Sequence, residues 1–150
     1  MAYWLVKTEP GTWSWDDQVK AGAKGTAWEG VRNHQAKQNL MKMKRGDRVF
    51  FYHSGEAPAV VGICEVVRES YPDPSAFDTA SHGWDPKSNK DAPTWYMVDL
   101  RAVAQFTKPV TLVDIKQRKG LENMALLRIG RLSVTPVTAA EWDIIRGMAS

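Results

Sequence analysis

The sequence has little of what metal binding or disulfide formation requires. One of its 150 residues is a cysteine, Cys64, and it lies in an apolar run, where a free thiol usually packs as a small hydrophobic side chain. The three histidines, His34, His53 and His82, are scattered, and no pair has the spacing typical of a metal site. We therefore expect no structural disulfide, no metal and no cofactor.

Long apolar runs and glycine-rich phosphate loops are also missing. The N-terminus is charged again at Lys7 and lacks the apolar core of a secretory leader, and no later stretch approaches the ~20 apolar residues that span a membrane. No glycine-rich loop follows the first predicted strand, residues 3–7, which argues against nucleoside triphosphate chemistry. We expect a soluble intracellular protein, cytoplasmic, with no membrane partner.

The chain shows no linker, internal repeat or low-complexity tract, so residues 1–150 are expected to form one domain. A chain of this length buries about 70% of the surface that its unfolded form exposes. Short stretches of strand character are separated by short helices, without the regular spacing of parallel βαβ units. This pattern predicts an α+β fold around a strongly bent sheet or small barrel, and it leaves the oligomeric state open.

Positive charge is concentrated in residues 28–54, which carry a net charge of +4 against +3 for the whole chain. So local an excess suggests an anionic partner at this stretch. Asn33 is the predicted N-cap of a helix with apolar residues spaced by four and three, and a strand is predicted over residues 49–52. Of the seven tryptophans, Trp13, Trp28 and Trp84 lie beside turn or polar residues, where an indole is either a lid on the core or a stacking surface.

Local signals predict further boundaries. Helix starts are predicted by the cap residues Ser14, Thr111 and Thr138. Residues 49–53 and 59–69 are predicted to pair as a hairpin, in which Gly62 indicates a bulge or a close approach by another backbone or a ligand. A strand over residues 94–106 is expected to be interrupted at residues 108–109, Lys-Pro. Residues 71–93, with four prolines, are predicted to form a long loop that is functional or mobile.

A series of motifs in order along the chain resembles the EVE domain family. They are YWLVKTEP at 3–10, WEGVRN at 28–33, KRGD at 44–47, FFYHS at 50–54, VGICEVV at 61–67, YPDP at 71–74, DPKS at 85–88, PVTL at 109–112 and LRIGRLSV at 127–134. The resemblance implies a PUA-like mixed β pseudo-barrel with flanking short helices, related to YTH and ASCH domains, with a pocket between sheet and helices. For relatives it implies recognition of a modified base in DNA or RNA.

The chain departs from the family pattern at three positions. The resemblance leads us to expect serine more often at Thr8, aspartate at Glu29 and tyrosine at His34. The first two changes conserve a hydroxyl and a charge, whereas His34 replaces a phenol with a smaller, titratable ring. If His34 lines the pocket, the preferred base could differ from that of relatives.

Reading a modified base requires extruding it from the stack, at a cost of a few kcal/mol. Stacking on one aromatic ring returns ~1–3 kcal/mol, so polar contacts must decide which base is held. Trp28 is our candidate stacking surface, the alternative being a lid on the core above Val31. Asn33 can donate and accept through one amide, but the N-cap role competes for its carbonyl oxygen.

The remaining candidates each have a plainer interpretation. Arg32 suits phosphate or a base carbonyl, or is a solvated arginine; Tyr52 could be core, and Trp84 could close over a ligand or pin its loop. The candidate base-binding residues are Lys7, Thr8, Glu9, Trp28, Val31, Arg32, Asn33, His34, Tyr52, His53, Ser54 and Trp84. The candidate phosphate-binding residues are Arg32, Lys37, Arg128 and Arg131.

The hypothesis that follows is a non-enzymatic reader of DNA or RNA, which holds a methylated cytosine derivative or a methylated adenine. The alternative is a small amidohydrolase of modified nucleosides, in which Lys7 activates Thr8 and Glu9 orients the amine. Adjacent strand residues alternate faces, so Lys7 and Thr8 are not expected to share a pocket unless the strand ends between them. A protein-interaction module is the third possibility.

Overall fold

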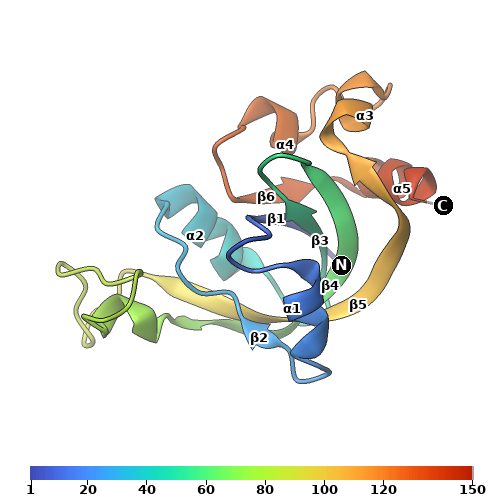
Figure 1. The fold of residues 1–150 in the computed structure, drawn as a ribbon. Helices are drawn as coiled ribbons and strands as arrows, with labels where there is room; N and C mark the ends of the chain where they lie inside the picture. Colours follow the sequence, from blue (N-terminus) through green and yellow to red (C-terminus); the bar gives the residue numbers. More distant parts are fainter. Residues whose placement is uncertain (150) are drawn as a thin grey trace.

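The computed structural model describes residues 1–149, which form a mixed six-stranded sheet with short helices around it (Figure 1). The elements are β1 Tyr3–Thr8, α1 Trp15–Lys20, β2 Thr26–Ala27, α2 His34–Lys42, β3 Arg48–His53, β4 Ala59–Pro72, the 3-10 helix η1 Pro74–Phe77, β5 Tyr96–Thr111, α3 Leu112–Gln117, α4 Ala125–Arg128, β6 Val134–Val137 and α5 Ala139–Met148. The strand order is β2-β5-β4-β3-β1-β6, with β1 and β3 parallel and the other pairs antiparallel. The α+β prediction is confirmed, and the sheet is bent but not closed.

The predicted helix starts are confirmed by their hydrogen bonds. Ser14 and Thr138 open capping boxes with Asp17 and Glu141, each side chain accepting from the other residue's backbone N–H. Asn33 caps α2, its Oδ1 accepting from the Ala36 N–H at 2.9 Å. These caps satisfy backbone donors that the first helical turn leaves unpaired, so short helices can begin at defined residues.

Gly62 lies where two strands and a helix meet. The pairing of β3 with β4 shifts register between Phe51 and Tyr52, which confirms the predicted bulge. A Cβ on Gly62 would lie 2.5 Å from the ring of Trp15 on α1. The close approach is therefore made by an indole packed against the bare backbone, and the absence of a side chain at residue 62 brings α1 onto the sheet.

The predicted interruption of β5 at residues 108–109 is wrong. The strand runs to Thr111, and its last two residues pair with Val60 and Ala59 on β4. Beyond Leu100 the outer side of β5 has no pairing with β2, and the partners of β4 jump from Val110 to Gln105. Pro109 falls in this irregular stretch of an edge strand, where a missing N–H breaks no ladder.

The sheet separates two hydrophobic clusters. Alternate residues of β1 and β3 point to opposite faces: Val6 and Phe51 join the cluster beneath α2, whereas Leu5, Phe50 and Tyr52 join the cluster beneath α5. Trp28 and Val31 belong to the cluster beneath α2, as do the inward positions of α2, Ala36, Leu40 and Met43. The site described below therefore lies on the α2 side of the sheet.

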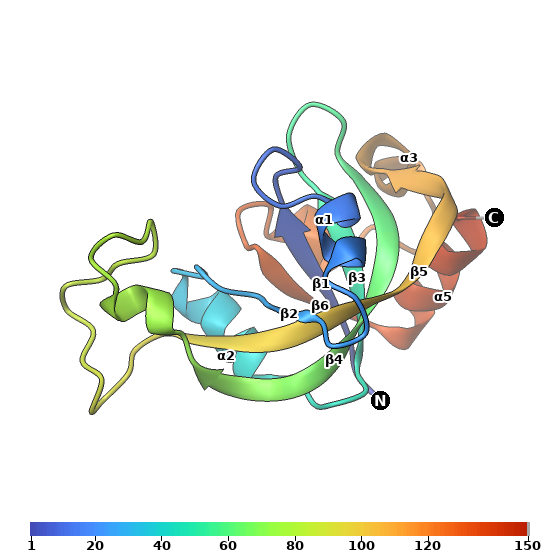
Figure 2. The ribbon, with the colours of Figure 1, turned by 60° about the horizontal axis from the view of Figure 1, so that its bottom comes forward.

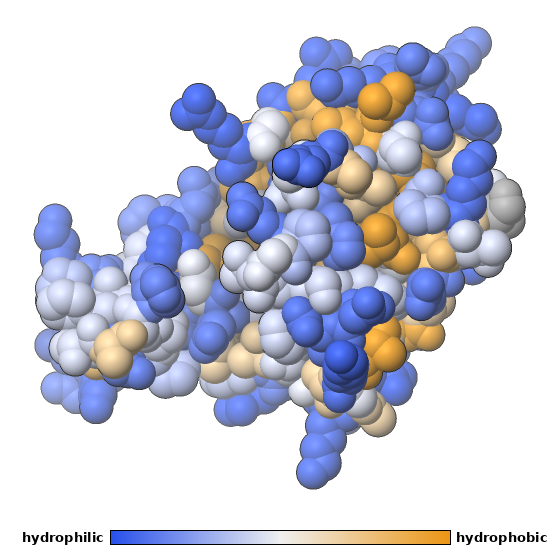
Figure 3. All heavy atoms as spheres, viewed as in Figure 1, coloured by the Kyte–Doolittle hydropathy of each residue, from blue (hydrophilic) through white to orange (hydrophobic). Residues whose placement is uncertain are grey.

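Residues 73–95, here called the excursion, leave the sheet between β4 and β5. The excursion projects past α2, at the left of Figures 1 and 2. Its two ends are adjacent, because Pro72 pairs with Tyr96 and the Asp73 N–H donates to the Trp95 carbonyl at 2.9 Å. In Figure 3 the excursion is largely hydrophilic, and the strongest orange on this face lies in the right half of the view. No helix within residues 1–149 is long and apolar enough to cross a membrane.

Candidate functional site

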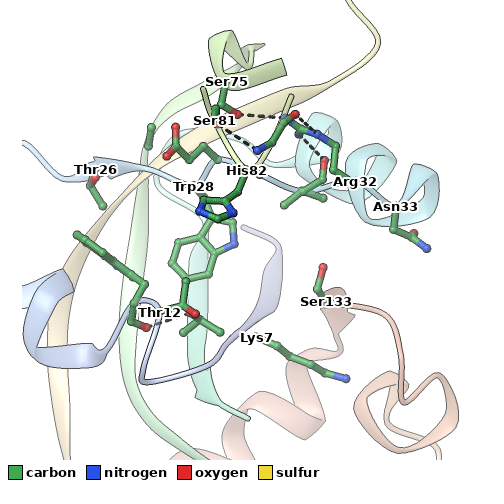
Figure 4. A pocket seen from close by; sticks show the side chains of 17 residues that line it. Lys7, Thr12, Thr26, Trp28, Arg32, Asn33, Ser75, Ser81, His82 and Ser133 are labelled. Atoms are coloured by element: carbon green, nitrogen blue, oxygen red, sulfur yellow. Dashed lines mark hydrogen bonds between the residues drawn. The ribbon is translucent and has the colours of Figure 1, made fainter. Parts of the chain in front are cut away.

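A cavity of about 870 Å³ opens where the end of β1, the segment before α2 and the excursion meet (Figure 4). Its wall comes from residues 7–8, 12–13, 26–33, 75, 81–83 and 133. Of the sequence-predicted site residues, the wall contains Lys7, Thr8, Trp28, Val31, Arg32 and Asn33. The volume lies within the ~300–1,000 Å³ typical of small-ligand sites.

Trp28 is both a lid on the core and part of the cavity wall. Its side chain is buried, and its backbone N–H donates to the Val98 carbonyl at 2.8 Å. Its indole and the ring of Phe51 pack in a T-shaped arrangement, with ring centroids 5.6 Å apart and planes at 83°. Because backbone and ring are both held, the indole needs little further ordering when a planar ligand packs against it.

A second indole, Trp13, also lines the cavity. Its Nε1–H donates to Gln18 Oε1 at 2.8 Å, and Gln18, which is fully buried, donates from Nε2 to the Leu100 carbonyl at 2.8 Å. The Thr8 hydroxyl donates to the Trp13 carbonyl at 2.9 Å. These bonds fix Trp13 from both its backbone and its ring.

Arg32 joins the segment before α2 to the excursion. Its Nε donates to the Gly83 carbonyl at 2.9 Å, and the two terminal nitrogens donate to Val31, Asp73, Ser75 and Gly83. A guanidinium has five N–H donors, and these five bonds use all of them. Arg32 therefore positions the excursion, and it could bind phosphate only by giving up bonds within the protein.

Asp73 accepts one of the hydrogen bonds from Arg32, and its side chain is fully buried. Burial by itself raises the pKa of Asp73, but hydrogen bonds from Ser75, Gly30 and Arg32 outweigh it and hold the pKa below its usual value. The Gly30 N–H donates at 2.8 Å, and Ser75 donates from both its N–H and its hydroxyl. We call this group of Asp73, Arg32 and Ser75 the Asp73 latch.

The start of α2 packs against Trp95, which is buried at the end of the excursion. His34 stacks on Trp95 with ring centroids 4.8 Å apart, and Arg32 and Lys37 place their charges 5.4 and 5.5 Å from the ring centroid. Trp95 Nε1 in turn donates to Asp85 at 2.6 Å. His34 and Lys37 thus lie outside the cavity wall, as part of the support that holds the excursion to α2.

Lys7 and Thr8 both line the cavity, although β1 continues through both residues, so the expectation that they would not share a pocket is wrong. Lys7 Nζ donates to the Gly130 carbonyl at 2.8 Å, and burial lowers its pKa. Within residues 1–149 no hydrogen bond joins Lys7 to the Thr8 hydroxyl, which donates to Trp13 instead. Glu9 is exposed and lies outside the wall.

The end of β3 lies outside the cavity wall. Tyr52 faces the α5 cluster, and burial raises its pKa. His53 Nε2 accepts a hydrogen bond from the Trp15 N–H at 3.0 Å; burial lowers the pKa of His53, and Asp16 opposes this effect. Ser54 donates from both its N–H and its hydroxyl to the Thr8 carbonyl. The last two residues support α1 and the end of β1.

Three further sequence-predicted residues lie on the surface outside the wall. Arg128 is exposed and donates to Asn123 at 3.0 Å, and Arg131 is exposed nearby, in the segment that Lys7 holds through Gly130. Trp84 is 48% exposed and directly follows the wall residue Gly83. The two arginines thus lie close in sequence to Ser133, which belongs to the wall.

Several wall residues carried no signal in the sequence. Thr12, His82 and Ser133 lie on loops and Ser75 lies in η1, and the fold brings these distant segments together. For Trp13 the only signal was an indole beside turn residues. No group of three His, Cys, Asp or Glu side chains within residues 1–149 could hold a metal ion, and burial raises the pKa of the Cys64 thiol.

Comparison with known proteins gives consistent matches. The sequence profile of the EVE domain family matches residues 2–148. Thymocyte nuclear protein 1 of Mus musculus is 39% identical over 162 residues, which cover 95% of this chain and 71% of that protein. The crystal structure of human THYN1 protein in complex with 5-methylcytosine-containing DNA is 33% identical, with a TM-score of 0.96 over 100% of this chain and 98% of that one. An ASCH protein of Zymomonas mobilis, 13% identical with a TM-score of 0.61 over the whole of both chains, shares the fold alone.

Proposed function

The chain belongs to the EVE domain family, and from this premise we propose that it binds DNA carrying a modified base and holds that base, extruded, in the cavity beside Trp28. The observation that carries the proposal is the cavity itself, which is lined by two fixed indoles and by polar side chains. The fold of the chain matches that of a protein crystallised with 5-methylcytosine-containing DNA. A methylated cytosine derivative is therefore the first base to test. Methylated adenine, and RNA as the polymer, follow.

The residues have distinct proposed roles. Trp28 is the stacking surface, and Val31 and Thr8 complete the wall around it. Asn33 uses its carbonyl oxygen to cap α2, which leaves its amide nitrogen to donate to a base edge. Lys37, Arg128 and Arg131 are proposed phosphate contacts, whereas we assign Arg32 a positioning role. Glu9, His34, Tyr52, His53, Ser54 and Trp84 lie outside the cavity wall, so they would act on its rim or through other residues.

The geometry favours binding over hydrolysis. A lysine that activates a hydroxyl must accept its proton, but Lys7 is directed to the Gly130 carbonyl and the Thr8 hydroxyl to the Trp13 carbonyl. A reader needs neither group to react. Because its proposed partner is nucleic acid, we propose an intracellular location, cytoplasmic or nuclear.

The test is a fluorescence-anisotropy titration with short, matched oligonucleotides. DNA and RNA, single and double strands, would carry cytosine, 5-methylcytosine, 5-hydroxymethylcytosine or N6-methyladenine at one position. We expect tighter binding to one modified base in DNA. Equal binding to all oligonucleotides would reduce the site to a backbone-binding surface and contradict the proposal.

Two substitutions assign the effect to the cavity. Trp28→Ala should abolish the preference for the modified base, whereas Trp28→Phe, which keeps an aromatic face and more of the core volume, should retain part of it. Circular dichroism and the melting temperature show whether each variant is folded. A folded Trp28→Ala variant with an unchanged preference would exclude stacking on this indole.

A further inference from the structure

The wall of the cavity contains one ring that neither the sequence nor the comparisons single out. His82 belongs to the excursion, and its exposed side chain lines the same cavity as Trp28. Figure 4 looks past the imidazole of His82 onto the indole of Trp28. The two rings come from segments more than fifty residues apart in the chain, and they share one open space.

The backbone on either side of His82 is held firmly. The Ser81 N–H donates to the Asp78 carbonyl at 2.9 Å, and the Gly83 N–H donates to the Ser81 hydroxyl at 3.0 Å. The Gly83 carbonyl accepts from Arg32, which is bound to the Asp73 latch. A Cβ on Gly83 would lie 2.6 Å from Arg32 Nη2, so only glycine permits this close approach.

The ring of His82, in contrast, is unengaged. Within residues 1–149 it has no hydrogen bond, ion pair or ring contact, whereas the indole of Trp28 already rests on Phe51. Because the backbone of the turn is already held, only the side-chain torsions of His82 remain to be ordered when a ligand binds. The hydrogen bonds of the turn are made by its backbone and by Ser81, to Arg32 and Asp78 or within the turn. None of them requires an imidazole at residue 82.

We propose that His82 is the second wall of the base site, so that a base resting on Trp28 is covered on its other face by the imidazole. This inference rests on the proposed function and names a contact residue that determines its specificity. One stacked ring about offsets the cost of extruding a base, so net affinity requires a further contribution. A second ring adds stacking energy only when the ligand is planar, so it favours an aromatic base.

The test compares His82→Ala and His82→Phe with the unsubstituted protein, in anisotropy titrations with a single strand and a duplex carrying one 5-methylcytosine. His82→Ala should weaken binding about tenfold, while His82→Phe should stay within about twofold of the unsubstituted protein. Thr79→Ala, an exposed position of the excursion outside the wall, is the matched control and should change nothing. Melting temperatures should be equal, since the ring has no partner to lose.

Each outcome assigns a cause. Unchanged affinity in His82→Ala, or equal weakening in His82→Phe and His82→Ala, would overturn the second wall and leave the reader function standing. If the unsubstituted protein prefers none of the modified strands of the earlier titration over its unmodified match, the proposed function fails, and the second wall fails with it. A preference of the unsubstituted protein for the modified strand, together with binding that His82→Ala weakens and His82→Phe retains, supports both.

Discussion

His53 lies outside the cavity wall but supports the helix α1. Its Nε2 accepts the N–H of Trp15, one of the donors that the first turn of α1 leaves unpaired. That nitrogen can accept only while it is unprotonated. The sequence indicated a possible ligand contact at His53, and the structure shows a support for α1, which in turn lies against Gly62.

We predict that this contact makes stability depend on pH. Burial lowers the pKa of folded His53 below the value near 6.5 of the unfolded chain. The stabilising contribution is therefore complete above about pH 6.5 and is lost as the pH falls through the folded pKa, because the unfolded chain takes up the proton first.

The measurement is the urea midpoint at pH 7.5 and pH 5.5 for the unsubstituted protein and for His53→Gln. A glutamine carbonyl can accept the same bond without titrating, so this variant should lose less stability on acidification. The other histidines are present in both proteins. Equal losses in the two proteins would show that His53 does not couple to folding.

Asn33 links the scale of a residue to that of an element, because one amide both begins α2 and faces the cavity. Asn33→Ala should cost about 1 kcal/mol of unfolding free energy through loss of the cap. Asn33→Ser keeps a capping oxygen without the amide donor or a new charge, so it should retain stability and still weaken binding to the modified oligonucleotide. Chemical denaturation and anisotropy together separate the two roles. Full affinity in Asn33→Ser would restrict Asn33 to the cap.

The excursion is held in place by hydrogen bonds to one buried side chain. Asp73 is fully buried and receives bonds from both Arg32 and Ser75. Asp73→Ala leaves these donors unsatisfied, and we expect it to destabilise the protein by a few kcal/mol. Hydrogen exchange should quicken first in residues 73–95 and at the start of α2. Asp91→Ala, an exposed acid of the same excursion, is the control and should leave exchange unchanged; uniform quickening across the sheet in Asp73→Ala would mean that the latch holds more than the excursion.

The elements also show which features a sequence can reveal. Caps such as Ser14 and Asn33 are local, because donor and acceptor lie within one helical turn, and each was predicted. The latch joins Arg32 to Asp73 across 41 positions, and no local pattern signals it. The strand β5 was wrongly predicted to be interrupted at Pro109. A proline destabilises a strand only where its missing N–H would have paired with a neighbouring strand, and this pairing is known only from the assembled sheet.

At the scale of the whole molecule, the motifs identified the family and the fold class before any contact was known. They did not identify the cavity wall, since segments that are distant in sequence supply Trp13, Ser75 and His82. The candidates on β3 illustrate the same limit. Tyr52 turns toward the α5 cluster because alternate strand residues face opposite sides, and the sequence alone does not say which side holds the ligand.

The salt dependence of nucleic-acid binding should depend on which surface charges contact phosphates. If Lys37 and Arg131 contact phosphates, Lys37→Glu and Arg131→Glu should each weaken binding to every oligonucleotide and lower the slope of log affinity against log salt by about one. Lys116→Glu, on α3 and remote from the excursion in Figure 1, is the matched control for net charge. A slope that falls equally in all three variants would point to the overall charge in place of a defined footprint.

The attachment of the excursion has a consequence for how this family can diversify. Its ends are neighbours in one strand pair, Pro72 opposite Tyr96, so the chain leaves the sheet and returns at a single point. Segments inserted in this way can be lengthened, shortened or replaced while the scaffold keeps its register. The side of the cavity that Trp28 and Phe51 support can then be combined with excursions of different sequence. A change in the preferred base would require substitutions in this surface segment and none in the core.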